Sequence, residues 1–220
     1  MLFLLSYRFI ILQTIKWQTY LTMAEKIMSQ TLVLASTSPF RKMLLEKLHL
    51  QFATAKPNVD ETPLARETAV ELVERLAVAK AAAVCPAYEN ALVIGSDQVC
   101  VNNGVILGKP GNFDNAFQQL KAASGKKITF YTGLALINSQ TGKTQSLVEP
   151  YVVQFRELSD DMITNYLNKE QPFNCAGSFK SEGYGIALFE GFEGKDPNSL
   201  IGLPLISLIK MLEKEDFAVI

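Results

Sequence analysis

The sequence has 220 residues, 48% of them hydrophobic, so it can bury a sizeable core as one large domain or two small ones. Its 21 lysines and arginines against 22 aspartates and glutamates give a formal net charge of −1, which provides no overall field for attracting nucleic acid or an anionic membrane. The single histidine, His49, excludes a histidine-based zinc site. We therefore expect no nucleic-acid or membrane partner, and a polyanionic ligand must be a small molecule held by a local cluster of cations.

The first residues contain two short apolar runs, LFLL and FIIL, each followed by a basic or polar segment. Both runs are shorter than the ~20 residues needed to span a bilayer, and no small-residue cleavage site follows them. We therefore interpret residues 1–28 as an extension outside the core, translated from upstream of a natural start at Met23 or Met28. A weak amphipathic anchor is the alternative. Residues 29–220 are predicted to form a single domain.

The first half of this domain alternates short β-rich runs with amphipathic helices, which is typical of an α/β fold. Ser38 and Pro39 provide the N-cap and first-turn proline of one helix, and Thr68 with Glu71 forms the capping box of another. The predicted elements are a strand over 31–36, a helix from Pro39 to about Leu48, an extended segment over 51–57, a loop over 58–63, a helix from Thr68 to about Val84, and a central strand over 91–101.

The second half is predicted to contain two long strands joined by a hairpin turn. The expected elements are a turn over 101–105, a helix over 112–124, strands over 126–139 and 144–158, a helix from Ser159 to about Lys169, extended segments over 173–179 and 184–194, and a last helix from Pro204 to about Lys214. No repeat or linker interrupts this order, so we expect one compact unit. The three cysteines, Cys85, Cys100 and Cys175, lack C-x-x-C spacing and are interpreted as reduced thiols of a cytoplasmic protein.

The run ASTSPFRK is the first candidate for chemistry, because a strand passes through serines directly into a helix N-terminus. Free N–H groups and the helix dipole make such a junction an anion site, and Ser36 lies at it. Cations in the first turn oppose the dipole by ~0.3–1 kcal/mol each, so Arg41 and Lys42 suggest a bound phosphate. The alternative is ordinary surface residues on an amphipathic helix.

Asp97 is the second candidate, since this carboxylate follows an apolar strand that should be buried. Burial without a partner costs several kcal/mol, so Asp97 needs a cation, a metal or N–H donors; a turn-capping role is the alternative. Lys80 follows Leu72 and Leu76 at helical spacing on the apolar face of its helix. It either extends its ammonium to the surface or contacts phosphate at the edge of a cleft.

Lys109 and Glu61 are weaker candidates, because polar residues beside a proline are ordinary in loops. Taken together, however, the acidic and basic residues at the ends of helices and strands suit a nucleotide that is bound with a metal ion. Carboxylates would hold a hard divalent ion, and the cations would hold the phosphates.

Eight separated runs resemble, in order, the motifs of the Maf family of nucleoside triphosphate pyrophosphatases, across residues 31 to about 213. They are LVLASTSPFRKMLLEKL, VDETP, RLAVAKA, VIGSDQVC, GKP, FYTGLAL, CAGSFKSEGYG and DPNSLIGLPL. The resemblance implies a Maf/ITPase-like α/β fold, an elongated mixed sheet with flanking helices and two lobes around a central cleft. It also implies hydrolysis between the α and β phosphates with a divalent metal cation, Mg²⁺ or Mn²⁺.

The resemblance assigns roles to residues of this chain. Asp97 is the expected proton acceptor and, with Glu61, the expected metal ligand. The expected phosphate-binding residues are Ser36, Arg41, Lys42, Lys80 and Lys109. Lys42 stands where many members carry a second arginine, so a point charge replaces a bidentate donor there. Whether two copies of the chain form a homodimer stays open.

Three further positions, Phe40, Gln98 and Glu182, resemble the specificity positions of the branch that acts on 7-methyl-GTP. N7 methylation makes guanine cationic, so an aromatic face gains ~0.5–2 kcal/mol from a cation–π contact. Glu182 would accept hydrogen bonds from the guanine N1–H and amine. Close relatives are expected to carry Trp at position 40, and the dTTP/UTP branch Arg.

Two other functions fit the same residues: a dTTP/UTP pyrophosphatase of the same family, and a non-catalytic nucleotide-binding regulator of septum formation. Phe40 as a core residue of its helix is the corresponding alternative for that position.

Overall fold

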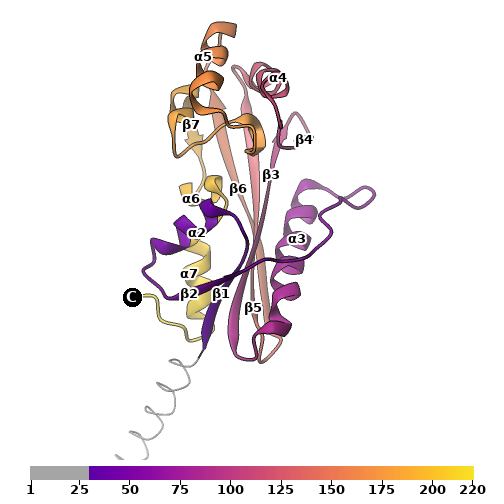
Figure 1. Ribbon diagram of the computed structural model, residues 1–220, viewed down its shortest axis with the longest axis vertical. Helices are drawn as coiled ribbons and strands as arrows, with labels where there is room; N and C mark the ends of the chain where they lie inside the picture. Colours follow the sequence, from indigo (N-terminus) through magenta and orange to yellow (C-terminus); the bar gives the residue numbers. More distant parts are fainter. Residues whose placement is uncertain (1–29) are drawn as a thin grey trace, which may run out of the picture.

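Three long antiparallel strands run through the structure and join its two lobes (Figure 1). The structure is a computed structural model that describes residues 30–220, and the predicted extension, residues 1–28, lies outside them. The strands are β3 (Ala91–Asn102), β5 (Lys127–Asn138) and β6 (Thr144–Phe155), each of 12 residues. At the usual rise per residue, each strand spans roughly 40 Å, which is enough to cross both lobes.

Shorter elements complete each lobe. In the lower lobe of Figure 1, β1 (Thr31–Ala35) pairs in parallel with β3 and with β2 (Phe52–Ala55), and the helices are α2 (Pro39–Glu46), α3 (Ala69–Val84) and α7 (Leu205–Glu213). In the upper lobe, β4 (Val105–Leu107) pairs with β3, β7 (Phe189–Glu193) pairs with β6, and the helices are α4 (Phe113–Ala123) and α5 (Asp160–Glu170). The sheet order is β2-β1-β3-β5-β6-β7, with β4 beside β3. The expected elongated mixed sheet with flanking helices is confirmed.

The direction of the side chains along β3 decides which residues can meet in the lower lobe. Successive side chains of a strand point to opposite faces. Leu92 and Ile94 belong to the hydrophobic cluster that includes residues of α2 and α7, whereas Val93 belongs to the cluster that includes residues of α3. Asp97 has the parity of Val93 and therefore faces α3, and Ser96 faces the other side. Coverage of both faces explains the continuous apolar run that predicted a central strand.

Two glycines let α3 lie directly on the sheet. A Cβ at Gly95 of β3 would overlap the carbonyl oxygen of Ala77, and a Cβ at Gly133 of β5 would overlap that of Val73. Gly133 is also the register partner of Asp97. The close approach of helix and sheet therefore occurs beside the acid that the sequence singled out.

The segments predicted as extended after α5 are partly helical, which corrects the sequence analysis. Residues 173–179 contain the 3₁₀ turn η2 (Ala176–Ser178). In residues 184–194, the 3₁₀ turn η3 (Tyr184–Leu188) precedes the strand β7. Gly177 has φ 75° and Ser178 has φ 62°, values that end an extended chain. Within residues 30–220, no helix combines the length and apolar character of a membrane span.

A short helix, α6 (Pro197–Ile201), was not predicted, although its signals are present. Asp196 is its N-cap, Pro197 occupies the first turn and Gly202, with φ 122°, follows its end. These are the usual start and stop residues of a helix. A helix of five residues is too short to show the apolar periodicity by which longer helices are recognised.

Replacing Gly95 by Ala should lower the free energy of unfolding by about 1–3 kcal/mol, because the new methyl forces α3 away from the sheet. Gly191→Ala is the matched control, since nothing lies within 4 Å of a Cβ there. Urea unfolding of both variants measures the difference. Equal stabilities for the two variants would contradict the close packing.

Candidate active site

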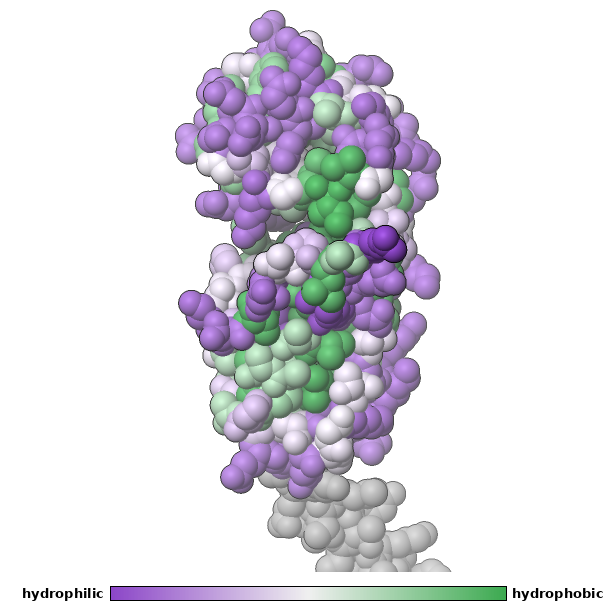
Figure 2. Space-filling model, turned by 90° about the vertical axis from the view of Figure 1, so that its right-hand side faces the viewer, coloured by the Kyte–Doolittle hydropathy of each residue, from purple (hydrophilic) through white to green (hydrophobic). Residues whose placement is uncertain are grey.

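A cleft of about 940 Å³ lies between the two lobes. Figure 2 shows a gap between the two lobes on the left side of the middle of this view, and an apolar patch on the upper lobe beside it. Nine of the residues singled out from the sequence line it: Ser36, Phe40, Arg41, Glu61, Lys80, Asp97, Gln98, Lys109 and Glu182. They come from both lobes and from segments far apart in the chain, so the fold brings the predicted set together.

One of the lysines that line the cleft lies between two carboxylates. The ammonium of Lys80 lies 2.6 Å from Asp97 Oδ1 and 2.8 Å from Glu61 Oε1. Lys80 is 6% exposed and Asp97 8%, so this pair is almost removed from water. Asp97 thus has the cation partner that its burial requires, and Lys80 turns inward rather than to the surface.

The junction of β1 and α2 presents a helix N-terminus to the cleft. Ser38 caps α2 by accepting a hydrogen bond from Arg41 N at 3.4 Å, and Ser36 Oγ accepts one from Ser38 N at 3.1 Å. Arg41 donates from Nε to the carbonyl of Gly202 at 2.8 Å, which turns its guanidinium toward the end of α6. Burial lowers the pKa of Arg41, and the charges of Asp97 and Glu61 oppose that shift. An arginine remains charged under such conditions.

Lys42 is not brought to this cleft. Its side chain is exposed, and its ammonium lies 3.8 Å from Glu46 Oε1, one turn along the same helix. The structure therefore separates Lys42 from the other predicted phosphate ligands.

Gln98 is fixed by the end of α6. Its Nε2 lies 2.7 Å from Ser199 O, 3.0 Å from Leu200 O and 2.9 Å from Thr132 Oγ1. Three acceptors around one amide nitrogen define which way the amide points. The carbonyl oxygen of Gln98 is therefore the atom that remains for a ligand, and it can only accept hydrogen bonds.

Lys109 lies in a loop that α4 holds at the upper rim. Asn115 donates to the carbonyl of Pro110 at 2.9 Å, and Gln119 donates to that of Gly108 at 3.1 Å. Gln119 also accepts from the hydroxyl of Ser178 at 2.5 Å. The backbone on both sides of Lys109 is thus fixed, while its exposed side chain reaches the cleft.

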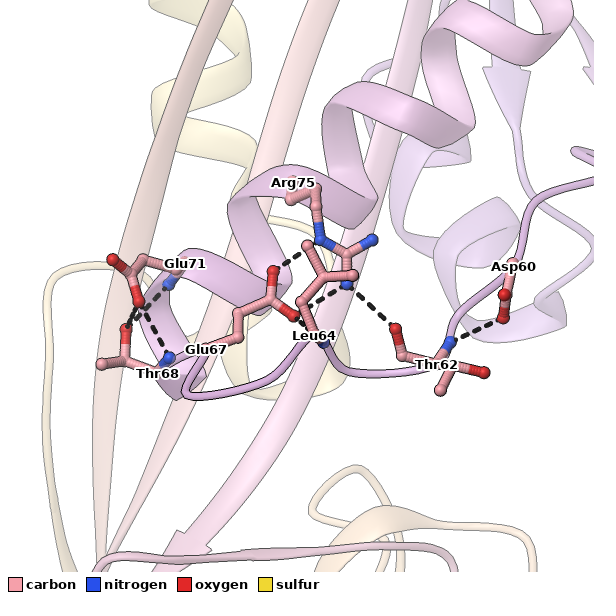
Figure 3. Close-up of polar contacts among 7 residues, drawn as sticks. All are labelled: Asp60, Thr62, Leu64, Glu67, Thr68, Glu71 and Arg75. Atoms are coloured by element: carbon pink, nitrogen blue, oxygen red, sulfur yellow. Dashed lines mark hydrogen bonds and ion pairs between the residues drawn. The ribbon is translucent and has the colours of Figure 1, made fainter.

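A charged clamp holds the loop that carries Glu61 (Figure 3). Arg75 of α3 binds both oxygens of Glu67, at 2.5 and 2.8 Å, and donates to the carbonyl of Thr62 at 3.2 Å. Glu67 also accepts from Leu64 N at 2.9 Å. The hydrogen bonds from Arg75 lower the pKa of Glu67 to about 2, against the opposing effect of burial. Because Thr62 follows Glu61 directly, this clamp fixes the backbone beside the carboxylate that contacts Lys80.

The family follows from a comparison with known proteins. The model of the family described as "Maf-like protein" matches residues 31–215, which is most of the chain. The chain belongs to the Maf family. A 7-methyl-GTP pyrophosphatase of Colwellia psychrerythraea is 61% identical to this Maf protein over 87% of the chain and 96% of its own length. The corresponding protein of Vibrio vulnificus is 59% identical over 86% of the chain and 97% of its own length.

Among solved structures, a HAM1 protein from Coxiella burnetii covers 84% of this chain and 99% of its own, with a TM-score of 0.48 and 15% identity. The Staphylococcus aureus Ham1 protein gives a TM-score of 0.47 and 13% identity, over 84% of this chain and all of its own.

The cleft of the Maf protein also contains polar residues that the sequence analysis did not select. They are Lys56, Gln171, Asn174, Lys180 and Ser181. Lys180 and Ser181 belong to the run CAGSFKSEGYG that carried the family resemblance, so that motif could have identified them as candidates. Lys56 and Asn174 lie in irregular segments with no pattern that marks them.

Carboxylates in the described part of the Maf protein do not form a complete metal cage. Within residues 30–220, no group of three or more His, Cys, Asp or Glu side chains is arranged to hold a metal. Glu61 and Asp97 nevertheless converge on one cation, the ammonium of Lys80. One or two carboxylates completed by substrate phosphates and water are a usual environment for Mg²⁺, so this pair fits a metal that arrives with a nucleotide.

The clamp predicts how stability depends on pH. The pKa of Glu67 lies below its ordinary value of 4.5, so the clamp's stabilisation should be complete above pH about 4.5 and decline as the pH falls toward about 2. Glu67→Gln should therefore be less stable than the unmodified protein near pH 7, with a gap that narrows on acidification. Urea unfolding over this range measures it. Glu190→Gln, an exposed carboxylate on β7, is the control for net charge, and a gap independent of pH would contradict the assignment.

Proposed function

We propose that this Maf protein is a nucleoside triphosphate pyrophosphatase that hydrolyses 7-methyl-GTP to 7-methyl-GMP and pyrophosphate, and so removes a modified nucleotide. The observation that carries the proposal is the 59–61% identity with two relatives of that name over almost their whole length. The cleft supports it, since acids, cations and an aromatic ring line one cavity of a size suited to a nucleotide.

Asp97 is the proposed proton acceptor for water that attacks the α phosphorus in line with the leaving pyrophosphate. One of its oxygens contacts Lys80, which leaves the other to take the proton. Lys80 also keeps the buried carboxylate compensated. The acid is therefore held in place by the same residue that would contact the substrate.

The proposed phosphate ligands are Lys80, Lys109, Arg41 and Ser36, together with the N-terminus of α2. They offset the charge that builds on pyrophosphate as it leaves. These groups approach from both lobes, so the triphosphate would lie across the cleft.

Phe40, Gln98 and Glu182 are proposed to select the base. The half-buried ring of Phe40 would stack on the cationic 7-methylguanine. Glu182 and the carbonyl oxygen of Gln98 would accept hydrogen bonds from the N1–H and the amine of guanine. Uracil and thymine lack that amine, which favours guanine at this site.

Glu61 and Asp97 are the proposed ligands of a divalent ion, Mg²⁺ or Mn²⁺. When bound, the ion would neutralise charge on the phosphate oxygens that complete its coordination. The clamp between Arg75 and Glu67 keeps the backbone beside Glu61 in position for this role. We assign the reaction to the cytoplasm, because the three free cysteines suit a reducing compartment.

Pyrophosphate release from 7-methyl-GTP, GTP, UTP and dTTP, with and without EDTA, tests the function. We expect the highest kcat/KM for 7-methyl-GTP and loss of activity in EDTA. Faster turnover of UTP or dTTP would make this chain a dTTP/UTP pyrophosphatase and overturn the base assignment. No release from any nucleotide would instead favour the regulator of septum formation.

Phe40 provides a second test. Phe40→Trp should lower KM for 7-methyl-GTP by about 2- to 10-fold, because indole gives the strongest cation–π contact, whereas Phe40→Leu should raise KM. GTP, whose base is uncharged, serves as the comparison substrate and should respond less. An equal response of KM for both substrates would exclude the cation–π contact.

A further inference from the structure

We propose that Glu170, at the end of α5, is a positioning residue for base selection: its carboxylate holds both ends of the turn 180–184 and so fixes Glu182 in the cleft. The inference rests on the proposed function, because it takes Glu182 as the residue that recognises the base. Glu170 itself is not among the residues that line the cleft, whereas Glu182 is. Any effect of Glu170 on a bound base must therefore be transmitted through the turn.

The two oxygens of Glu170 bind the two ends of the turn. Oε1 accepts a hydrogen bond from Lys180 Nζ at 3.0 Å, and Oε2 accepts one from Tyr184 N at 2.9 Å. Lys180 Nζ also donates to the backbone carbonyl of Glu170 at 3.0 Å. The Glu170 side chain is 17% exposed, so little water competes for these contacts. One carboxylate thus spans the segment whose middle residue is Glu182.

Other residues on the same face of α5 support the turn. Tyr166 and Glu170 are one helical turn apart and lie on one face. The hydroxyl of Tyr166 accepts from Lys180 N at 3.1 Å, and its ring stacks on Tyr184 with centroids 6.0 Å apart. The ammonium of Lys169 lies 5.1 Å from the centroid of the Tyr184 ring. The turn is therefore anchored at the two positions that flank its exposed apex.

The apex itself has few contacts of its own. Glu182 is exposed, and its contact with Ser181 Oγ is long, at 3.4 Å. Gly183 lies against the anchoring carboxylate, since a Cβ there would lie 3.1 Å from Glu170 Oε2. Ordering a loose glutamate on binding costs conformational entropy. A backbone fixed in advance by Glu170 lowers that cost, which strengthens binding of a base that Glu182 can pair with.

The ionisation of Glu170 agrees with this arrangement. Burial acts to raise its pKa, but the hydrogen bonds from Lys180 and from Tyr184 N together outweigh burial and lower it. Glu170 is thus ionised at neutral pH, and both of its oxygens can accept the hydrogen bonds that Lys180 and Tyr184 donate.

The test is a set of four variants measured with 7-methyl-GTP and UTP: Glu170→Gln, Glu182→Gln, the double variant, and Asp161→Asn as a control. Asp161 is an exposed carboxylate on the same helix, in its first turn. We expect Glu170→Gln to raise KM for 7-methyl-GTP about tenfold, with kcat and the KM for UTP changed less than about twofold. In the Glu182→Gln background the same change should add less than about twofold, since Glu170 acts through Glu182. The control should behave as the unmodified protein.

Two results would overturn the inference. One is an unchanged KM for 7-methyl-GTP in Glu170→Gln; the other is a full tenfold effect of Glu170→Gln when Glu182 is already replaced. If thermal unfolding shows that Glu170→Gln is poorly folded, Gly183→Ala is the second variant, because its Cβ would lie 3.1 Å from Glu170 Oε2 and shift the carboxylate by a few tenths of an ångström. The KM for 7-methyl-GTP should then rise by a smaller factor, about two- to threefold, and an unchanged KM would count against the inference. The unmodified protein reports separately on the proposed function, because preference for UTP there refutes the base assignment whatever the variants do.

Discussion

A buried lysine that contacts a carboxylate of the sheet and a carboxylate of a loop is the interaction on which the rest of the cleft depends. Lys80 reaches Asp97 only because glycines let α3 lie directly on β3 and β5. Removing one member of a buried ion pair generally costs about 3–5 kcal/mol, since the other charge is left uncompensated. The ammonium of Lys80 also contacts Glu61 in the loop. The packing of α3, the position of the loop and the placement of both acids in the cleft therefore depend on one another.

Much of this was predictable from the sequence, because the signals are local. The capping box of Thr68 and Glu71 defines the start of α3, and the apolar run of β3 indicates a strand covered on both faces. The need of Asp97 for a partner follows from its burial alone. The identity of that partner does not, because it depends on how α3 packs against β3. Lys80 on an apolar helix face had two interpretations, and only tertiary contact decides between them.

The differences between the structure and the expectations from the sequence have equally physical causes. Successive helical residues are about 100° apart, so when Arg41 faces the cleft Lys42 faces solvent, although the two are adjacent in the motif. Residues 173–179 and 184–194 were predicted as extended, yet positive φ values at Gly177 and Ser178 and the 3₁₀ turns η2 and η3 shape much of these segments. Such turns have no hydrophobic period. Glu182, the residue proposed to read the base, lies between these two segments. Hydrogen bonds from Lys180 and Tyr184 to Glu170 of α5 hold the turn that carries it, and the sequence of the turn does not indicate this.

The most direct test of the role of Asp97 compares nucleotide binding with pyrophosphate release in Asp97→Asn, by calorimetry and by single-turnover kinetics with 7-methyl-GTP. The amide preserves the size of the side chain and removes the proposed proton acceptor, while Glu61 still contacts Lys80. We expect Kd to change less than about fivefold and pyrophosphate release to fall by about 10²–10⁴-fold. Full turnover in the variant would contradict the central role of Asp97.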